Sequence, residues 1–190
     1  MEIKTTLSGY ILAGGKSSRM GTDKALLLVQ QEPMLRRMIG LLKPFCKTIA
    51  ISGEKPGYYE FNLEIVKDLY TDCGPISGII SSLKHSSTDW NLLISVDVPF
   101  MNEAFIQYLI SHLGNYDCII PEHEGGVEPL MGIYNKQIIP VVEEMIGLGD
   151  YKLKRLLSKL NVRYVNCNPL IKQFPRLFVN INLPGDYQSI

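Results

Sequence analysis

The sequence predicts an α/β protein in which helices cover both faces of a mostly parallel central sheet. Short apolar runs of strand length alternate along the chain with segments whose apolar residues recur at helical spacing. No internal repeat, low-complexity stretch or linker divides the 190 residues, so we expect a single domain spanning residues 1–190. Together these observations imply a Rossmann-like, three-layer α/β/α architecture.

The first half of the chain supplies four predicted strands and two predicted helices. The strands are the apolar runs at residues 7–12, 48–52, 63–66 and 91–96, the last of which is the clearest buried strand. Apolar residues at helical spacing predict a helix over residues 34–42. Pro75, a residue favoured in a first helical turn, begins the second predicted helix, residues 75–83. The intervening segment, residues 53–59, is expected to be an exposed loop.

The second half continues the alternation. Asn102 is a candidate N-cap for a helix whose apolar face contains Phe105, Ile106, Leu109 and Ile110. Two further helices are predicted at residues 137–145 and 151–160. The remaining predicted strands are residues 118–120, 130–134, 162–165 and 177–181, and residues 123–127 are expected to form an exposed loop.

Composition excludes several classes of function. Lys and Arg together number 19, as do Asp and Glu, so no overall field attracts nucleic acid or an anionic membrane. The four cysteines are scattered without a C-x-x-C pair, which favours free buried thiols over disulfides. The N-terminus lacks a signal-peptide core and no apolar stretch reaches membrane-spanning length. We therefore expect a soluble cytoplasmic protein.

The glycine-bearing loop after the first predicted strand is the strongest functional signal. Gly14 and Gly15 follow Leu12-Ala13, and glycine lets backbone N–H groups approach a phosphate closely. Arg19 and Lys24 add two cations, a composition suited to capturing a polyphosphate. Neither the P-loop pattern nor the dinucleotide pattern G-x-G-x-x-G is present, so the loop is of another kind. The alternative is an ordinary glycine turn with solvated cations.

Two aspartates also follow predicted strands. Asp97 comes directly after the apolar run ending at Val96, where a carboxylate facing bound phosphates suits Mg²⁺. Asp68 follows the strand ending at Val66, where an acidic residue can accept hydrogen bonds from a ribose or base. Each has a structural alternative as a turn residue, and for Asp97 also as a helix N-cap. Gly78, inside a predicted helix, leaves room for either a ligand or close packing.

Two asparagines lie at and just after the last predicted strand. In a strand over residues 177–181 the alternation of side chains would place Asn180 and Asn182 on one face. The alternative is turn chemistry before Pro184. The three histidines lack metal-ligand spacing, and we assign them no role.

The run L-A-G-G-x-S-x-R-M-G-x-D-K, residues 12–24, resembles the signature loop of the molybdenum cofactor guanylyltransferases. These belong to the larger nucleotidyltransferase superfamily. Weaker similarities follow in the same order along most of the chain: Asp68, the Gly-Pro-Ile-Ser-Gly segment ending at Gly78, Asp97, Glu128-Pro129, and the Asn-x-Asn-x-Pro segment at residues 180–184. The acidic pair that usually follows this proline is here Gly185-Asp186.

The resemblance implies transfer of GMP from GTP to the terminal phosphate of molybdenum-molybdopterin, which yields the guanine dinucleotide cofactor and pyrophosphate. By the same resemblance Arg19, Lys24 and Asp97 would be catalytic, and Asp97 would hold Mg²⁺. The implied nucleotide site comprises Leu12, Ala13, Gly14, Gly15, Lys24, Asp68, Gly78 and Asp97, and the implied acceptor site Asn180 and Asn182. Molybdoenzymes or other proteins of cofactor biosynthesis are implied partners.

Two other functions stay open from the residues alone. One is a related nucleotidyltransferase that uses CTP or a sugar phosphate, because neither composition nor spacing distinguishes GTP from CTP. The other is a module that binds GTP without chemistry. The joint presence of Arg19, Lys24 and Asp97 argues against mere binding, which does not need all three.

Overall fold

The computed structural model describes residues 6–14 and 23–181, and within them the main sheet has eight strands. Their order is β10-β7-β9-β6-β1-β4-β5, with β8 paired to β7. The strands are β1 (Leu7–Leu12), β4 (Cys46–Ser52), β5 (Glu64–Val66), β6 (Trp90–Ser95), β7 (Cys118–His123), β8 (Gly126–Val127), β9 (Met131–Asn135) and β10 (Val162–Asn166). Strand β9 runs antiparallel to both neighbours, whereas β5, β4, β1 and β6 are mutually parallel. The predicted mostly parallel α/β sheet is confirmed.

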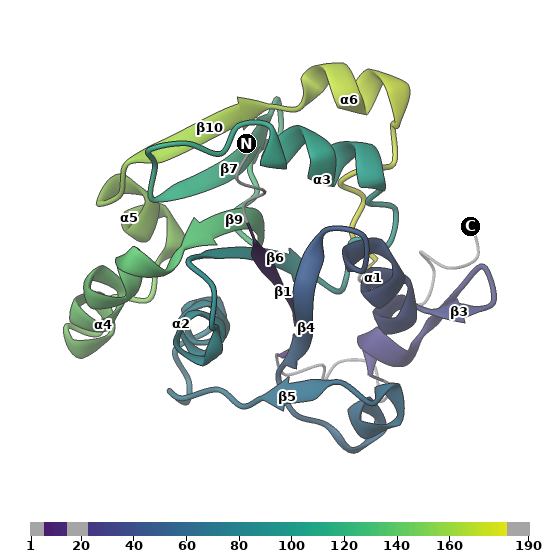
Figure 1. Ribbon diagram of the computed structural model, residues 1–190, viewed down its shortest axis with the longest axis horizontal. Coiled ribbons are helices and arrows are strands. Elements are labelled where there is room, and N and C mark those ends of the chain that lie inside the picture. The colour runs from purple at the N-terminus through teal and green to yellow at the C-terminus, as the bar shows by residue number, and fades with distance from the viewer. Residues whose placement is uncertain (1–5, 15–22, 182–190) are drawn as a thin grey trace.

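Six helices pack on the two faces of the sheet (Figure 1). They are α1 (Met34–Leu42), α2 (Pro75–His85), α3 (Glu103–Ile110), α4 (Ile139–Gly147), α5 (Leu153–Ser158) and α6 (Asn168–Gln173). Side chains of α1, α3 and α6 join one apolar core, and those of α2, α4 and α5 join the other. Each sheet face therefore has its own core, which gives the three layers.

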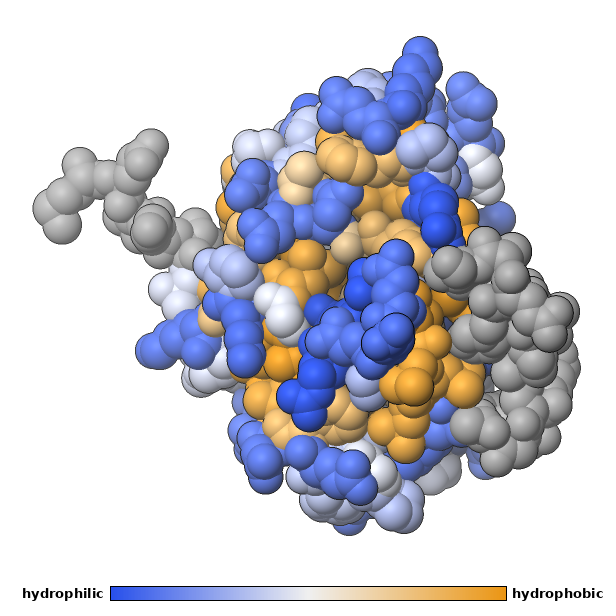
Figure 2. All heavy atoms as spheres, turned by 90° about the vertical axis from the view of Figure 1, so that its right-hand side faces the viewer, coloured by the Kyte–Doolittle hydropathy of each residue, from blue (hydrophilic) through white to orange (hydrophobic). Residues whose placement is uncertain are grey.

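Among the described residues, three short 3₁₀ helices and one small hairpin lie in the connections between the main helices and strands. The 3₁₀ helices are η1 (Lys24–Leu26), η2 (Pro56–Phe61) and η3 (Lys136–Ile138), and a small hairpin is formed by β2 (Leu28–Val29) and β3 (Glu32–Pro33). Figure 2 shows the face at the right of Figure 1, where hydrophobic residues are interrupted by groups of polar and charged ones. In the described part of the chain no helix is long and apolar enough to cross a membrane.

The observed helix boundaries match the predicted ones for α1 and at the start of α3, and differ from them for α4 and α5. Helix α1 begins and ends at the predicted residues. Asn102 caps α3 as predicted, its Oδ1 accepting a hydrogen bond of 3.0 Å from the Phe105 N–H. The helix predicted from Tyr151 begins only at Leu153, and the one predicted over residues 137–145 is divided between η3 and α4.

The predicted strand over residues 177–181 is wrong. This segment follows α6 in a turn, where the Leu177 N–H donates to the Phe174 carbonyl and the Val179 N–H donates to that of Arg176. The apolar residues at 177 and 181 are buried not because they alternate on a strand but because they close over the core beside α3.

Two predicted exposed loops also need correction. Residues 53–59 run into η2, and the Tyr58 side chain there is fully buried, its hydroxyl donating to the Ala13 carbonyl at 3.0 Å. Residues 123–127 are not a plain loop but a tight hairpin, in which His123 of β7 pairs with Gly126 of β8 across a short exposed turn. The contact that orders residues 53–59 is long-range and leaves no local periodicity, whereas the hairpin at residues 123–127 is a local pairing.

Candidate active site

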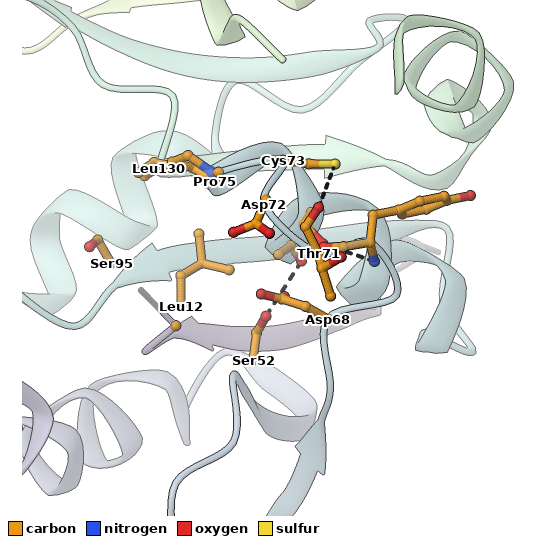
Figure 3. A pocket seen from close by; sticks show the side chains of 14 residues that line it. Leu12, Ser52, Asp68, Thr71, Asp72, Cys73, Pro75, Ser95 and Leu130 are labelled. Atoms are coloured by element: carbon orange, nitrogen blue, oxygen red, sulfur yellow. Dashed lines mark hydrogen bonds between the residues drawn. The ribbon is translucent and has the colours of Figure 1, made fainter. Parts of the chain in front are cut away.

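A cavity of about 810 Å³ lies at the carboxyl ends of β1, β4 and β6 (Figure 3). Its lining comes from these strand ends, from the chain between β5 and α2, from the first turn of α2, and from one residue before β9. The lining residues are Leu12, Gly14, Ser52, Asp68, Tyr70, Thr71, Asp72, Cys73, Gly74, Pro75, Ser77, Gly78, Ser95 and Leu130. The carboxyl ends of parallel strands are where α/β folds bind ligands, as the sequence predicted.

The backbone after β1 is bound firmly to its neighbours. The Ala13 N–H donates to the Ser52 carbonyl at 2.9 Å, and the Val96 N–H donates to the Leu12 carbonyl at 3.2 Å. The Ala13 carbonyl accepts from the buried Tyr58 hydroxyl. Because these backbone groups already have protein partners, Leu12 offers the cavity chiefly its side chain, and Gly14 is the first residue of the loop to line it.

Gly53 makes this close approach of two loops possible. Its φ is +109°, and a Cβ added there would lie 2.6 Å from the Gly14 nitrogen and 2.7 Å from the Gly14 Cα. Both atoms are backbone, so neither can swing aside. Sequence reasoning missed Gly53, because its constraint comes from a segment about 40 positions away in the chain.

Asp68 and Gly78 meet at the cavity wall, as their predicted site roles require. A Cβ on Gly78 would lie 3.3 Å from Ser52 Oγ, 3.5 Å from Leu12 Cδ2 and 4.0 Å from Asp68 Oδ1. Gly78 packs closely against its neighbours and also lines the cavity, and its role toward a ligand stays a prediction. Partial burial raises the pKa of the Asp68 carboxyl.

Two serines of α2 hold the chain between β5 and α2. Ser77 Oγ donates to the Tyr70 carbonyl at 2.6 Å, and Ser81 Oγ accepts from the Leu69 N–H at 2.9 Å. Both serines are 1% exposed. Asp72 has a φ of +56°, and its carboxylate and that of Asp68 are drawn on the same side of the cavity in Figure 3. Sequence reasoning also missed the serines, whose spacing in α2 is the one available signal.

Lys24 begins η1 and directly follows Asp23, the first described residue after residues 15–22. Asp23 caps this short helix by accepting from the Ala25 N–H, and it also pairs with Lys55 Nζ at 2.9 Å. Asp23 thereby fixes the backbone from which Lys24 extends. Burial and the neighbouring Asp23 carboxylate raise the pKa of Tyr58 well above its ordinary value.

Asp97 lies two residues beyond β6 and borders the cavity through Ser95. The Ser95 hydroxyl donates to Asp97 Oδ1 at 2.6 Å, and Ser95 itself lines the cavity. The Ile181 N–H donates to the Asp97 carbonyl at 2.9 Å. The C-terminal segment with Asn180 thus lies beside Asp97, although no strand brings it there.

Similarity to known proteins identifies the family of this chain. A family model described as the MobA-like NTP transferase domain matches residues 9–164. The chain belongs to this family. The match begins within β1, ends within β10 and includes the whole cavity lining.

Relatives match over nearly the full length of this MobA-like transferase. A probable molybdenum cofactor guanylyltransferase from Clostridium perfringens is 34% identical over 188 residues, which cover 96% of this chain and 95% of the relative. A molybdenum cofactor guanylyltransferase from Vibrio parahaemolyticus is 31% identical, with 96% and 93% covered. The crystal structure of molybdopterin-guanine dinucleotide biosynthesis protein A from Archaeoglobus fulgidus superposes with a TM-score of 0.80 at 25% identity, covering 96% and 95%.

The remaining predicted site residues of this MobA-like transferase are Gly15, Arg19 and Asn182, which lie outside the described residues. Among the described residues no group of three or more His, Cys, Asp or Glu side chains could hold a metal ion. Within residues 6–14 and 23–181, Asp97 therefore belongs to no cage of several carboxylates. Its hard oxygen ligand fits Mg²⁺ all the same, because Mg²⁺ in nucleotide sites is held by one or two carboxylates together with water and phosphates.

Proposed function

We propose that this MobA-like transferase transfers GMP from GTP to the terminal phosphate of molybdenum-molybdopterin. The observation that carries the proposal is its similarity, along nearly the whole chain, to proteins named molybdenum cofactor guanylyltransferase. The cavity supports it, since Gly14, Asp68, Gly78 and Ser95, which is hydrogen bonded to Asp97, line it at one edge of the sheet.

The reaction needs no nucleophilic side chain. An oxygen of the acceptor's terminal phosphate attacks the α-phosphorus of GTP, the bond to the β-phosphate oxygen breaks, and pyrophosphate leaves with that electron pair. Catalysis then consists of positioning the two phosphates and stabilising the charge that develops on them. In this proposal Lys24 and Arg19 hold the triphosphate and the leaving pyrophosphate by charge-assisted hydrogen bonds.

Asp97 is the proposed Mg²⁺ ligand. Bound there, Mg²⁺ would offset negative charge on the phosphates. The Ser95 hydroxyl already donates to one of the Asp97 carboxylate oxygens, which fixes the side chain and leaves the other oxygen for the ion. Asp68 and Gly78, with Leu12, Ala13, Gly14 and Gly15, form the proposed nucleotide site. Asn180 and Asn182 are the proposed acceptor contacts.

Asp97→Asn tests this arrangement. The variant keeps the shape and one acceptor oxygen but loses the charge, so transfer should fall by at least about a hundredfold, the loss typical of impaired metal sites. Metal-free GTP binding should persist, because removing a carboxylate removes repulsion toward the triphosphate. Guanylyl transfer across a magnesium titration measures this, with Asp89→Asn, at the start of β6, as the matched control. Near-wild-type turnover at ordinary magnesium would refute the metal assignment.

A nucleotide panel tests the donor. Pyrophosphate release in the presence of molybdopterin should be fastest with GTP, and slower with ATP, CTP and UTP. Preference for CTP would instead assign the chain to a cytidylyltransferase. Tight GTP binding without pyrophosphate release would favour a binding module.

A further inference from the structure

An aromatic stack ties the C-terminal segment to β7 and α3. The Phe178 ring lies 4.8 Å from the His123 ring, centroid to centroid, at an interplanar angle of 20°. Phe105 on α3 packs against the Phe178 ring in an edge-to-face arrangement, with 5.3 Å between the ring centroids and an interplanar angle of 90°. Phe178, which lies beyond the last helix, is thus held by rings from two separate elements.

Both nitrogens of the His123 ring are hydrogen bonded. The Gly125 N–H donates to Nδ1 at 3.0 Å, so Nδ1 acts as the acceptor and the ring proton belongs on Nε2. From there it is donated to Glu128 Oε1 at 3.1 Å. His123 and Glu128 side chains are only 15% and 28% exposed. The ring is therefore fixed in one orientation, face-on to Phe178.

The segment that Phe178 belongs to is attached at both ends to the loop containing Asp97. At one end the Arg176 guanidinium lies 3.7 Å from the centroid of the Phe100 ring. At the other end the Ile181 N–H donates to the Asp97 carbonyl at 2.9 Å. The Ile181 side chain is fully buried. Movement of Phe178 would therefore be transmitted directly to the Asp97 backbone.

We propose that His123 is a positioning residue for the transfer reaction. Through Phe178 it holds the C-terminal segment against the loop of Asp97, and through Glu128 it holds the chain that leads to Leu130 in the cavity wall. One imidazole thus links the C-terminal segment to the chain that precedes β9. The role in turnover rests on the proposed function, whereas the link itself does not.

His123→Phe is the first test, because it keeps an aromatic ring for Phe178 and removes both hydrogen bonds. We expect kcat to fall and the magnesium concentration for half-maximal rate to rise, each by roughly tenfold, as when a residue supporting a metal ligand is lost. The affinity for GTP without metal should stay within about twofold, because the described cavity lining does not include His123. His112→Phe, the same change at the end of α3, is the matched control.

Gly125→Ala disturbs the same ring without changing it. A Cβ at Gly125 would lie 2.8 Å from His123 Cε1, so the ring must shift. Gly125 is not among the glycines with a positive φ, and its backbone accepts alanine without strain of that kind. The variant should therefore lower kcat in the same sense as His123→Phe, though less.

Amide exchange supplies a readout that needs no substrate. In His123→Phe the Ile181 amide, which is bonded to the Asp97 carbonyl, should exchange faster, while amides of β6 keep their wild-type protection. Wild-type exchange at Ile181 in both variants would overturn the proposal, as would equal loosening of β6, which would mean general destabilisation. If the wild-type enzyme transferred no GMP, the proposed function would fail, yet the exchange result would still decide the link.

Discussion

Gly53 illustrates how the absence of a side chain shapes the proposed site. Its left-handed backbone and its contact with the Gly14 backbone bring the ends of β1 and β4 together. Part of the cavity lining could be predicted from local sequence, because Leu12 ends an apolar strand, Gly14 comes soon after it, and Asp68 follows the strand ending at Val66. Gly53 could not, because the atoms it must avoid belong to the Gly14 backbone beyond another strand, and only folding brings them close.

We predict that Gly53→Ala damages both stability and binding. The new Cβ adds backbone strain of about 1–3 kcal/mol and displaces the start of the glycine loop. The melting temperature should fall, and GTP affinity at a temperature where the variant is folded should drop about tenfold, the equivalent of 1.4 kcal/mol. Thermal unfolding and calorimetry measure the two effects.

Gly40→Ala is the matched control for that experiment. Gly40 lies within α1, and no neighbouring atom lies within 4 Å of the position that a Cβ would take, so nothing opposes alanine. Alanine is the better helix former, and the variant should gain about 0.5–1 kcal/mol of stability. Unchanged GTP affinity in both variants would contradict the role given to Gly53.

At the scale of elements, α2 acts as a support for the loop that precedes it. Ser77 and Ser81 face the loop through hydroxyls that bond to its backbone, whereas Ser82 Oγ donates to the Gly78 carbonyl inside the helix. The sequence predicts the helix itself, with Pro75 in its first turn. Its supporting role was not predicted, because a buried serine carries no signal of its partner.

Ser77→Ala should loosen this loop. The Tyr70 carbonyl and N–H both lose their partner in a nearly buried place, at a cost of about 1–3 kcal/mol. GTP affinity should fall because the loop forms a cavity wall. Ser82→Ala, which removes a bond within α2, should lower stability without changing GTP affinity. Equal effects of both variants on affinity would show that the loop does not depend on Ser77.

The C-terminal segment shows where reasoning by element fails. Alternating apolar residues from Leu177 to Ile181 predicted a strand, but they follow Pro175, and turn hydrogen bonds replace a ladder. The backbone next to Asn180 nevertheless contacts the loop of Asp97, because the Ile181 N–H donates to the Asp97 carbonyl. The acceptor role of Asn180 stays a prediction. The conformation of the segment could not be predicted, because a strand depends on pairing partners that its own sequence does not encode.

At the scale of the whole molecule, the reactivity of the Cys46 and Cys118 thiols depends on whether the protein is folded. Burial raises the pKa of Cys46 and of Cys118 from 9.0 to about 12, so both stay protonated in the folded protein at pH 8–9. Because the thiolate is the reactive form, we expect iodoacetamide to modify these two cysteines only after unfolding. Mass spectrometry of samples alkylated across a urea series measures this.

The raised pKa values of Cys46 and Cys118 also predict how the stability of the folded protein changes with pH. The unfolded chain releases the thiol protons at a lower pH than the folded protein does, so the free energy of unfolding falls as pH rises from about 9 towards 12. The urea midpoint at pH 10 should therefore be lower than at pH 8, and Cys118→Ala should reduce that difference. Rapid alkylation of Cys118 in the native protein would contradict its burial.

The strand order divides the sheet into two parts that meet between β9 and β6. Strands β1, β4, β5 and β6 come from residues 7–95, and β7 to β10 come from residues 118–166, so each side of the sheet is built from one continuous stretch of chain. In the described residues the two sides pair through β6 and β9, supported by packing of α2 against α4. A break in the turn after α3 would therefore leave two fragments, each with its own part of the sheet, that meet through the β6–β9 pairing and the contact of α2 with α4.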